Sequence, residues 1–151
     1  MSTVSLTGND TLNLAGTVLA DFADGDIAEL AFPNELMAVK TGKNGNSIFA
    51  FNATGLQCDL KVRVIRGSYD DKFLNGLIQD LKADVAGFTL IDAQLVKRVG
   101  DGQGNITNDT YILGGGVPTR QVAATSNVEG GTDQSVAIYE FKFTNTNRGI
   151  L

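Results

Sequence analysis

Two pairs of neighbouring carboxylates are the residues of this chain whose types and spacing could do acid–base chemistry. Asp24 and Asp26 flank a glycine, and Asp70 and Asp71 begin a helical pattern. Paired carboxylates can divide the roles of acid and base when their environments separate their pKa values. A turn accounts for the first pair, and a helix macrodipole favours the second. Neither pair predicts a catalytic site.

The composition excludes the usual nucleophile–base pairs. The 151 residues include no histidine and one cysteine, Cys58. Cys58 falls on the apolar side of a predicted strand, so we expect a buried thiol and not a nucleophile. The sequence therefore predicts a protein that is not an enzyme.

Motifs for metals and phosphates are incomplete. Asp101, Gln103 and Asn105 alternate as in a calcium loop, but Ile106 stands where that loop needs glycine and no bidentate glutamate follows. The glycines of residues 100–104 lack the spacing of a dinucleotide-binding turn, and Gly42-Lys43 lacks the residues of a phosphate loop. We expect no metal and no cofactor.

Length and composition indicate a single domain over residues 1–151 with its own core, since 42% of the residues are hydrophobic. The net charge of −5 argues against unaided nucleic-acid binding, which depends on lysine and arginine. No apolar run is long enough to cross a membrane, and the first residues lack a signal-peptide pattern. We expect a soluble protein made in a cytoplasm.

The elements that must position any functional side chain are mostly strands. Apolar and charged residues alternate from Cys58 to Val64, and a period of two is the pleat of a β-strand. This alternation places Asp59, Lys61 and Arg63 on the solvent face. A second alternating strand, residues 89–99, places Asp92, Gln94 and Arg98 opposite its apolar side chains.

Shorter alternations predict further strands, in which Val18 and Phe32 are among the side chains expected to face inward. We also expect a turn at residues 24–26 and a break in the sheet at the glycines of 114–116. These strands are predicted over residues 11–18, 27–32, 47–51, 107–113, 117–125 and 134–144.

One helix is predicted over residues 70–85, where apolar residues recur at the helical period. Ser68 and Asp71 resemble a capping box, and we expect Gly87 to end the helix in a left-handed conformation. Residues 33–46 are predicted as a long irregular loop, a length that is more often functional than accidental. The sequence therefore predicts a mainly β fold, an antiparallel β-sandwich or open barrel with one flanking α-helix, whose strand edges could continue a sheet into a neighbour.

Short motifs along nearly the whole chain resemble, in order and spacing, the tail tube proteins of contractile-tailed bacteriophages. The motifs are Asp24-Gly25-Asp26, Phe32-Pro33-Asn34, Ala38-Val39-Lys40-Thr41-Gly42-Lys43-Asn44-Gly45, Arg66-Gly67-Ser68, Val96-Lys97-Arg98-Val99-Gly100-Asp101-Gly102, Gly114-Gly115-Gly116-Val117 and Asn127-Val128-Glu129-Gly130. The resemblance implies a structural virion protein whose subunits close into six-membered rings, joining their sheets into one β-barrel. Stacked rings make a hollow tube through which a tape-measure protein and then DNA pass, without specific DNA binding.

The resemblance also implies partners and candidate contact residues. The partners are other copies of the chain and the sheath, tape-measure, baseplate and tail-terminator proteins, in a virion tail assembled in the bacterial cytoplasm, with no membrane binding by this subunit. We expect the loop to make the ring-to-ring contact through Asn34, Lys40, Thr41, Lys43 and Asn44. The solvent faces of the two alternating strands, named above, become candidates for the lumen or outer surface of the tube.

Two alternatives stay open. Related tubes occur in phage-tail-like bacteriocins and type VI secretion systems, and the chain could be a tube subunit of such a particle. A different class of protein, a monomeric β-sandwich binding module, would normally present exposed aromatic residues, whereas here there is no tryptophan and the three tyrosines are scattered.

Overall fold

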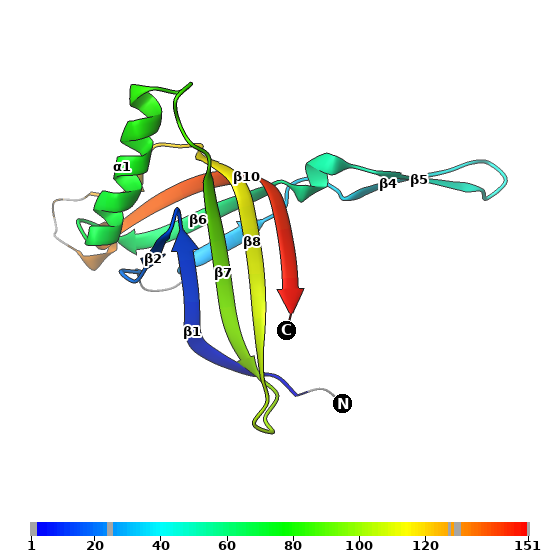
Figure 1. The fold of residues 1–151 in the computed structure, drawn as a ribbon, viewed down its shortest axis with the longest axis horizontal. Coiled ribbons are helices and arrows are strands. Elements are labelled where there is room, and N and C mark those ends of the chain that lie inside the picture. The colour runs from blue at the N-terminus through cyan, green and yellow to red at the C-terminus, as the bar shows by residue number, and fades with distance from the viewer. Residues whose placement is uncertain (1–2, 24–25, 127, 129–130, 151) are drawn as a thin grey trace.

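In the computed structural model the chain folds into a curled antiparallel sheet, a half-barrel, with the helix α1 packed against it (Figure 1). The structure describes residues 3–23, 26–126, 128 and 131–150. The predicted turn at residues 24–26 therefore lies largely outside the described residues. The elements are β1 (Ser5–Leu14), β2 (Thr17–Leu19), β3 (Ala28–Ala31), β4 (Met37–Thr41), β5 (Ser47–Phe51), a 3₁₀ turn (Ala53–Leu56), β6 (Cys58–Ile65), α1 (Tyr69–Ala83), β7 (Ile91–Gly100), β8 (Ile106–Pro118), β9 (Ala123–Ala124), a second 3₁₀ turn (Thr132–Ser135) and β10 (Val136–Ile150).

The main sheet has the order β2-β1-β7-β8-β10-β6-β3, with β9 beside the first part of β10. Every pairing is antiparallel. Strand β10 is long enough to pair with β6 through its first half and with β8 through its second. The separate hairpin β4–β5 pairs only with itself among the described residues.

The core lies between α1 and one face of the sheet. The predicted alternation of β6 is confirmed, because its apolar side chains are buried and the residues between them are not. Tyr139, Phe141 and Phe143 of β10 are also buried, as are Leu74 and Ile78 of α1. Full burial of each large apolar side chain stabilises the fold by about 1.5–3 kcal/mol. The mainly β fold with one flanking helix is confirmed.

Helix α1 begins where the sequence predicts. The Ser68 hydroxyl accepts a hydrogen bond from the Asp71 amide at 3.2 Å, and the Asp71 carboxylate accepts one from the Gly67 amide at 2.7 Å. The prediction for the other end is wrong. The helix ends at Asp84 in an extended conformation, and Gly87 is not left-handed but donates its amide to the Asp84 carboxylate at 3.1 Å.

The predicted strand over residues 11–18 is wrong, because the chain reverses within it. Ala15 and Gly16 both have positive φ, 54° and 83°. Two successive left-handed residues form the tight turn that suits a hairpin, here between β1 and β2. Val18 consequently lies outside the core, with 57% of its surface exposed.

The glycines at 114–116 do not break the sheet, and no long strand follows them. Strand β8 runs through them to Pro118, and β9 is only two residues long. Gly116 lies under the Phe143 ring, where a β-carbon would come within 2.3 Å of a ring carbon. Gly115 adopts a φ of 64° at a point where β8 gains a residue relative to β7, which is a β-bulge. Within one strand, Gly115 therefore allows the bulge and Gly116 allows the close contact with the Phe143 ring.

The irregular loop predicted at residues 33–46 is also wrong, since it contains β4 and half of the β4–β5 hairpin. The predicted strand at 47–51 is confirmed as β5. The predicted strand at 27–32 is shorter, and Phe32 lies beyond its end, 45% exposed, with its ring centroid 6.5 Å from that of Tyr111.

Candidate assembly surfaces

The β4–β5 hairpin projects away from the body of the molecule (Figure 1). Its tip is closed by hydrogen bonds from the Gly42 amide to the Asn46 carbonyl at 2.7 Å and from the Gly45 amide to the Gly42 carbonyl at 3.0 Å. Gly45 has a φ of 85°, a conformation that a side chain would strain. An isolated two-stranded hairpin is marginally stable in water.

Apolar residues of the hairpin are exposed to an unusual degree. Directly paired residues share a face, so Met37 and Val39 lie with Phe51 and Phe49, while Lys40 lies with Ile48 on the opposite face. Val39, Ile48, Phe49 and Phe51 are each 59–69% exposed. Exposed apolar patches on a protein surface are typical of protein–protein or membrane interaction sites and of ligand-binding grooves.

The five residues predicted for the loop contact are distributed along this hairpin. Asn34 lies at its base, where its amide donates to the Thr54 carbonyl at 3.3 Å. Lys40 and Thr41 lie in β4, and the Thr41 hydroxyl lies 3.4 Å from that of Ser47 in β5. Lys43 and Asn44 form part of the tip. The side chains of all five residues reach solvent.

The base of the hairpin is fixed to the body by the 3₁₀ turn Ala53–Leu56. The Asn52 amide donates to the Leu36 carbonyl at 2.8 Å, and the Thr146 hydroxyl of β10 donates to the Leu56 carbonyl at 2.8 Å. Gly55 lies so close to Leu36 that a β-carbon would come within 2.6 Å of the Leu36 α-carbon. The hairpin therefore leaves the sheet in a defined direction.

Two strand edges of the main sheet are not paired with another strand among the described residues. Strand β2 covers β1 only at residues 12–14, which leaves residues 5–11 of β1 unpaired on that side. Strand β6 covers β10 only as far as Phe143, which leaves residues 144–150 unpaired on that side. These edges flank a four-stranded segment in the order β1-β7-β8-β10 (Figure 1). Unpaired edges are templates for pairing with another chain.

Ion pairs within the four-stranded segment hold both edge strands. Lys97 of β7 lies 3.0 Å from the Asp10 carboxylate of β1, and the Arg148 guanidinium of β10 makes two bonds to Asp109 of β8, at 2.7 and 2.8 Å. The hydrogen bond from Arg148 lowers the pKa of Asp109 below its usual range, while that from Asp109 raises the pKa of Arg148. The Arg148 guanidinium also lies over the Tyr111 ring, 5.4 Å from its centroid.

Asp92, Gln94 and Arg98 lie on the face of this segment opposite the core. All three are exposed, and β-pairing places Gln94 in one row with three residues of the neighbouring strands, Asn13, Ile112 and Asn147. The next row holds Thr11, Val96, Thr110 and Gly149. Apart from the Asp92 and Arg98 charges, the polar side chains of this face are amides and hydroxyls.

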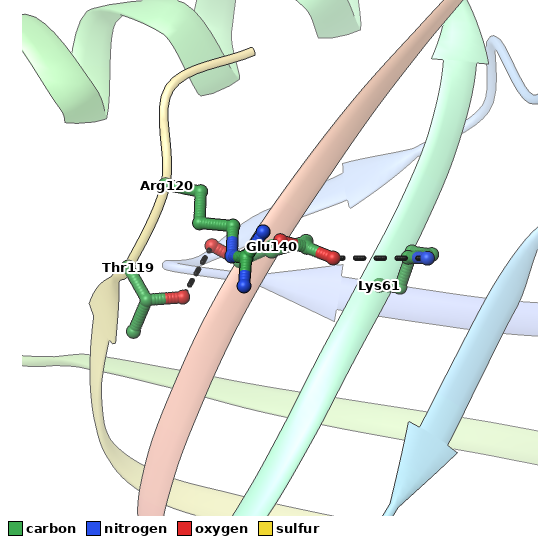
Figure 2. A network of polar contacts seen from close by, with 4 residues as sticks. All are labelled: Lys61, Thr119, Arg120 and Glu140. Carbon is green, nitrogen blue, oxygen red and sulfur yellow. Dashed lines mark hydrogen bonds and ion pairs between the residues drawn. The ribbon is translucent and has the colours of Figure 1, made fainter. Parts of the chain in front are cut away.

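Asp59, Lys61 and Arg63 lie on β6, which β8 and β10 separate from β7, and they do not join that row. The Glu140 carboxylate of β10 lies between Lys61, at 3.7 Å, and Arg120, at 2.9 Å. Figure 2 shows this network and the Thr119 hydroxyl, which donates to the Glu140 carbonyl at 3.4 Å. These partly exposed ion pairs tie the chain after β8 to β10 and contribute little stability.

The groups that could do chemistry have structural partners. The Asp70 carboxylate is buried and accepts hydrogen bonds from the amides of Ala20 and Asp21, both at 2.6 Å. Cys58 is fully buried, and burial raises its pKa from 9.0 to about 11. Asp101 accepts the Asn105 amide within its turn, a hydrogen bond that lowers the Asp101 pKa. Within residues 3–23, 26–126, 128 and 131–150, no three His, Cys, Asp or Glu side chains gather as a metal site, and no described helix is long and apolar enough to span a membrane.

Sequence reasoning missed the apolar hairpin residues and the free edge of β10. The Asn44-Gly45 pair between Val39 and the Ile48-Phe49 pair is a hairpin signal that could have found the first. The free edge has no local signal, because it depends on where β6 ends relative to β10.

Three solved structures that share this half-barrel come from an extracellular contractile injection system and from the anti-feeding prophage. One chain in the cryo-EM structure of the sheath/tube terminator of an extracellular contractile injection system, PVC, in its extended state has a TM-score of 0.64 and 10% identity, with 94% of both chains covered. A chain of the tube-terminating cap of the anti-feeding prophage has a TM-score of 0.62 and 7% identity, over 94% of this chain and 88% of that one. A chain of the PVC sheath–tube complex has a TM-score of 0.61 and 10% identity over the same shares. No protein-family model and no curated protein matches the chain.

Proposed function

We propose that this chain is a non-enzymatic structural subunit of a contractile injection particle, and that its copies form rings which stack into a hollow tube. The observation that carries the proposal is the pair of free edges on the four-stranded segment. Adjacent strands in the segment are antiparallel, so β1 and β10 run in opposite directions. The free edge of β10 in one copy can therefore pair antiparallel with the free edge of β1 in the next.

The free edges match in extent, since residues 5–11 and 144–150 are stretches of equal length at opposite sides of the segment. A contact between different surfaces of identical subunits closes a ring when the rotation between copies permits it. We propose rings of six, as the family resemblance implies. Repeated pairing would remove all exposed edges of the segment.

The face that bears Gln94 and Arg98, with Asp92 at its end, is proposed to line the lumen. Helix α1 and the core occupy the opposite face, so the ring closes with the helix outside. Asp59, Lys61 and Arg63 lie beyond the four-stranded segment and are assigned to the outer wall. The Asp92 and Arg98 charges cancel, and a lumen without net positive charge does not retain DNA or another polyanion by counterion release.

The β4–β5 hairpin is proposed to make the contact between stacked rings, through Asn34, Lys40, Thr41, Lys43 and Asn44 and its exposed apolar residues. The proposed partners are further copies of this chain and the sheath, tape-measure, baseplate and terminator proteins of the particle. The fold neighbours come from an extracellular injection system and an anti-feeding prophage. They favour the tube of a phage-tail-like particle over the virion tail tube, with DNA ejection, that the sequence predicts.

A second candidate function is that of a tube terminator, because two of the fold neighbours are chains of a tube-terminating cap and a sheath/tube terminator. A terminator would form one ring and cap a tube, whereas a tube subunit would stack without limit. Electron microscopy of the purified protein over a range of concentrations separates the two. Stacked hollow tubes support the first proposal, single rings support the second, and a strictly monomeric protein would support the binding-module alternative.

A further inference from the structure

A groove opens between the C-terminal half of α1 and the end of the main sheet where the β1–β2 turn meets the start of β7. Its apolar part includes Leu77, Phe88 and Leu90, and its polar part includes Asp80, Asp84 and Asp92. No basic residue lines it among the described residues. Leu90 is 56% exposed, so the apolar part is open to a partner.

The hairpin has the opposite charge. Residues 37–51 include Lys40 and Lys43 and no acidic residue, while the whole chain has a net charge of −5. Both lysines are exposed. Hairpin and groove are therefore complementary in sign within a protein that is otherwise acidic, and such complementarity selects and orients a partner.

The hairpin also offers apolar side chains that match the groove. Ile48 lies on the Lys40 face and is 69% exposed, and Phe49 lies on the other face and is 66% exposed. A strand rises about 3.3 Å per residue, so residues 34–43 extend roughly 30 Å from the body. That reach is enough to enter a neighbouring subunit.

The hairpin cannot fill the groove of its own subunit. Figure 1 shows it leaving the sheet on the side away from α1, whereas the groove lies beside α1. Two complementary surfaces at different places on one molecule make a head-to-tail contact between copies.

We propose that the tip of the β4–β5 hairpin of one copy docks into this groove of a second copy, with Lys40 and Lys43 against the Asp80 and Asp84 carboxylates. We assign the second copy to the adjacent ring, because the hairpin is the proposed contact between stacked rings. This inference rests on the proposed stacking of rings.

The test is a charge-reversal pair. The hairpin variant is Lys40→Glu with Lys43→Glu, and the groove variant is Asp80→Lys. Asp92 is left unchanged because its carboxylate lies beside Gly114 on the proposed lumen face. Asp84 is left unchanged because it accepts the Gly87 amide. A control variant, Lys72→Glu with Lys142→Glu, matches the charge change of the hairpin variant on residues outside both surfaces. Circular dichroism and thermal unfolding establish that each variant folds.

Tube yield by electron microscopy and pair formation by sedimentation velocity are the two readouts. We expect each variant alone to lose roughly tenfold or more in both, because like charges then face each other. An equal mixture recovers both, since each hairpin finds a groove of opposite charge, and the control behaves as wild type. Variants that assemble normally alone, or a mixture no better than its components, overturn the docking. If the wild-type protein forms pairs but no tubes, the docking is supported and the proposed tube function is contradicted. If it forms neither pairs nor tubes, both the docking and the tube function are contradicted.

Discussion

The phenol of Tyr139, in the middle of β10, donates a hydrogen bond to the carboxylate of Asp71 in the first turn of α1. The phenol oxygen also lies 2.9 Å from the Asp71 carbonyl oxygen, and the Tyr139 side chain is fully buried. The other carboxylate oxygen of Asp71 accepts the Gly67 amide. One carboxylate thus joins the helix start to the central strand of the sheet, and burial together with Asp71 raises the pKa of Tyr139 above its ordinary value.

The first prediction removes this phenol. Tyr139→Phe keeps the ring in the core and leaves one oxygen of the Asp71 carboxylate without its phenol donor, so we expect a loss of about 1.5–3 kcal/mol in the free energy of unfolding. Urea denaturation measures the loss. In a double-mutant cycle with Asp71→Ala the two losses should not add, because both changes break the same bond. Additive losses would show that the two side chains act independently.

The second prediction concerns the bend in β8. Gly116→Ala would push a β-carbon into the Phe143 ring, and overpacking of this kind costs about 1–3 kcal/mol. Gly114→Ala is the matched control, because its β-carbon would meet nothing closer than 3.5 Å, and we expect a change within about 0.5 kcal/mol. Thermal unfolding of both variants gives the comparison. Equal losses would mean that the Phe143 contact does not select glycine at 116.

The third prediction is chemical. Cys58 is fully buried, and its pKa of about 11 leaves little thiolate at pH 8. We expect a thiol reagent such as DTNB to react with the folded protein roughly a hundredfold or more slowly than with the urea-unfolded chain. Fast labelling of the folded protein would mean that the start of β6 opens readily.

The fourth prediction is a pH dependence. The folded-state pKa of Asp109 is lowered by the hydrogen bond from Arg148, so this carboxylate stabilises the fold above its unfolded pKa of about 4. The stabilisation is lost as the pH falls through the lower folded-state value. Wild type should therefore be more stable than Asp109→Asn at pH 7, and the difference should vanish at the acidic end of a denaturation series from pH 7 to pH 2. A difference that is constant with pH would exclude the ion pair as its cause.

The sequence predicted the elements whose burial alternates, and it missed those that long-range contacts determine. Strand β6 and the first half of β10 lie half-buried against the core, so their pattern appears in the sequence. All residues of β4 and β5 are exposed, so burial imposes no period on them, and of the two only β5 was predicted as a strand. Gly116 looks like a strand breaker until Phe143 is placed above it, and Ala15 carries no turn signature although its φ is positive.

The residues of the candidate site were also predicted only in part. The solvent positions of Asp59 and Gln94 followed from alternation, and the structure confirms that both side chains are exposed. Their separation by two strands could not be predicted, because sheet order depends on pairings between distant residues. The contact residues between positions 34 and 44 were predicted to lie on a loop. They lie on a hairpin instead, and the exposed apolar residues of that hairpin were not predicted.

The last prediction tests whether those apolar residues serve assembly. Phe49→Ser with Phe51→Ser changes side chains that are 66% and 62% exposed, so the free energy of unfolding of the isolated subunit should change by no more than about 1 kcal/mol. If the hairpin is buried between subunits, each phenylalanine contributes about 1.5–3 kcal/mol to that contact. The association constant should then fall by a factor of about 100 or more. Deleting residues from the 34–45 segment should act in the same direction.

The control is Val85→Ser, which changes an exposed apolar residue outside the hairpin. Electron microscopy should show tubes for the control and few or none for the hairpin variants at the same concentration. Since both classes of variant keep the folded core, normal tubes from the double serine variant would remove the hairpin from the contact between rings.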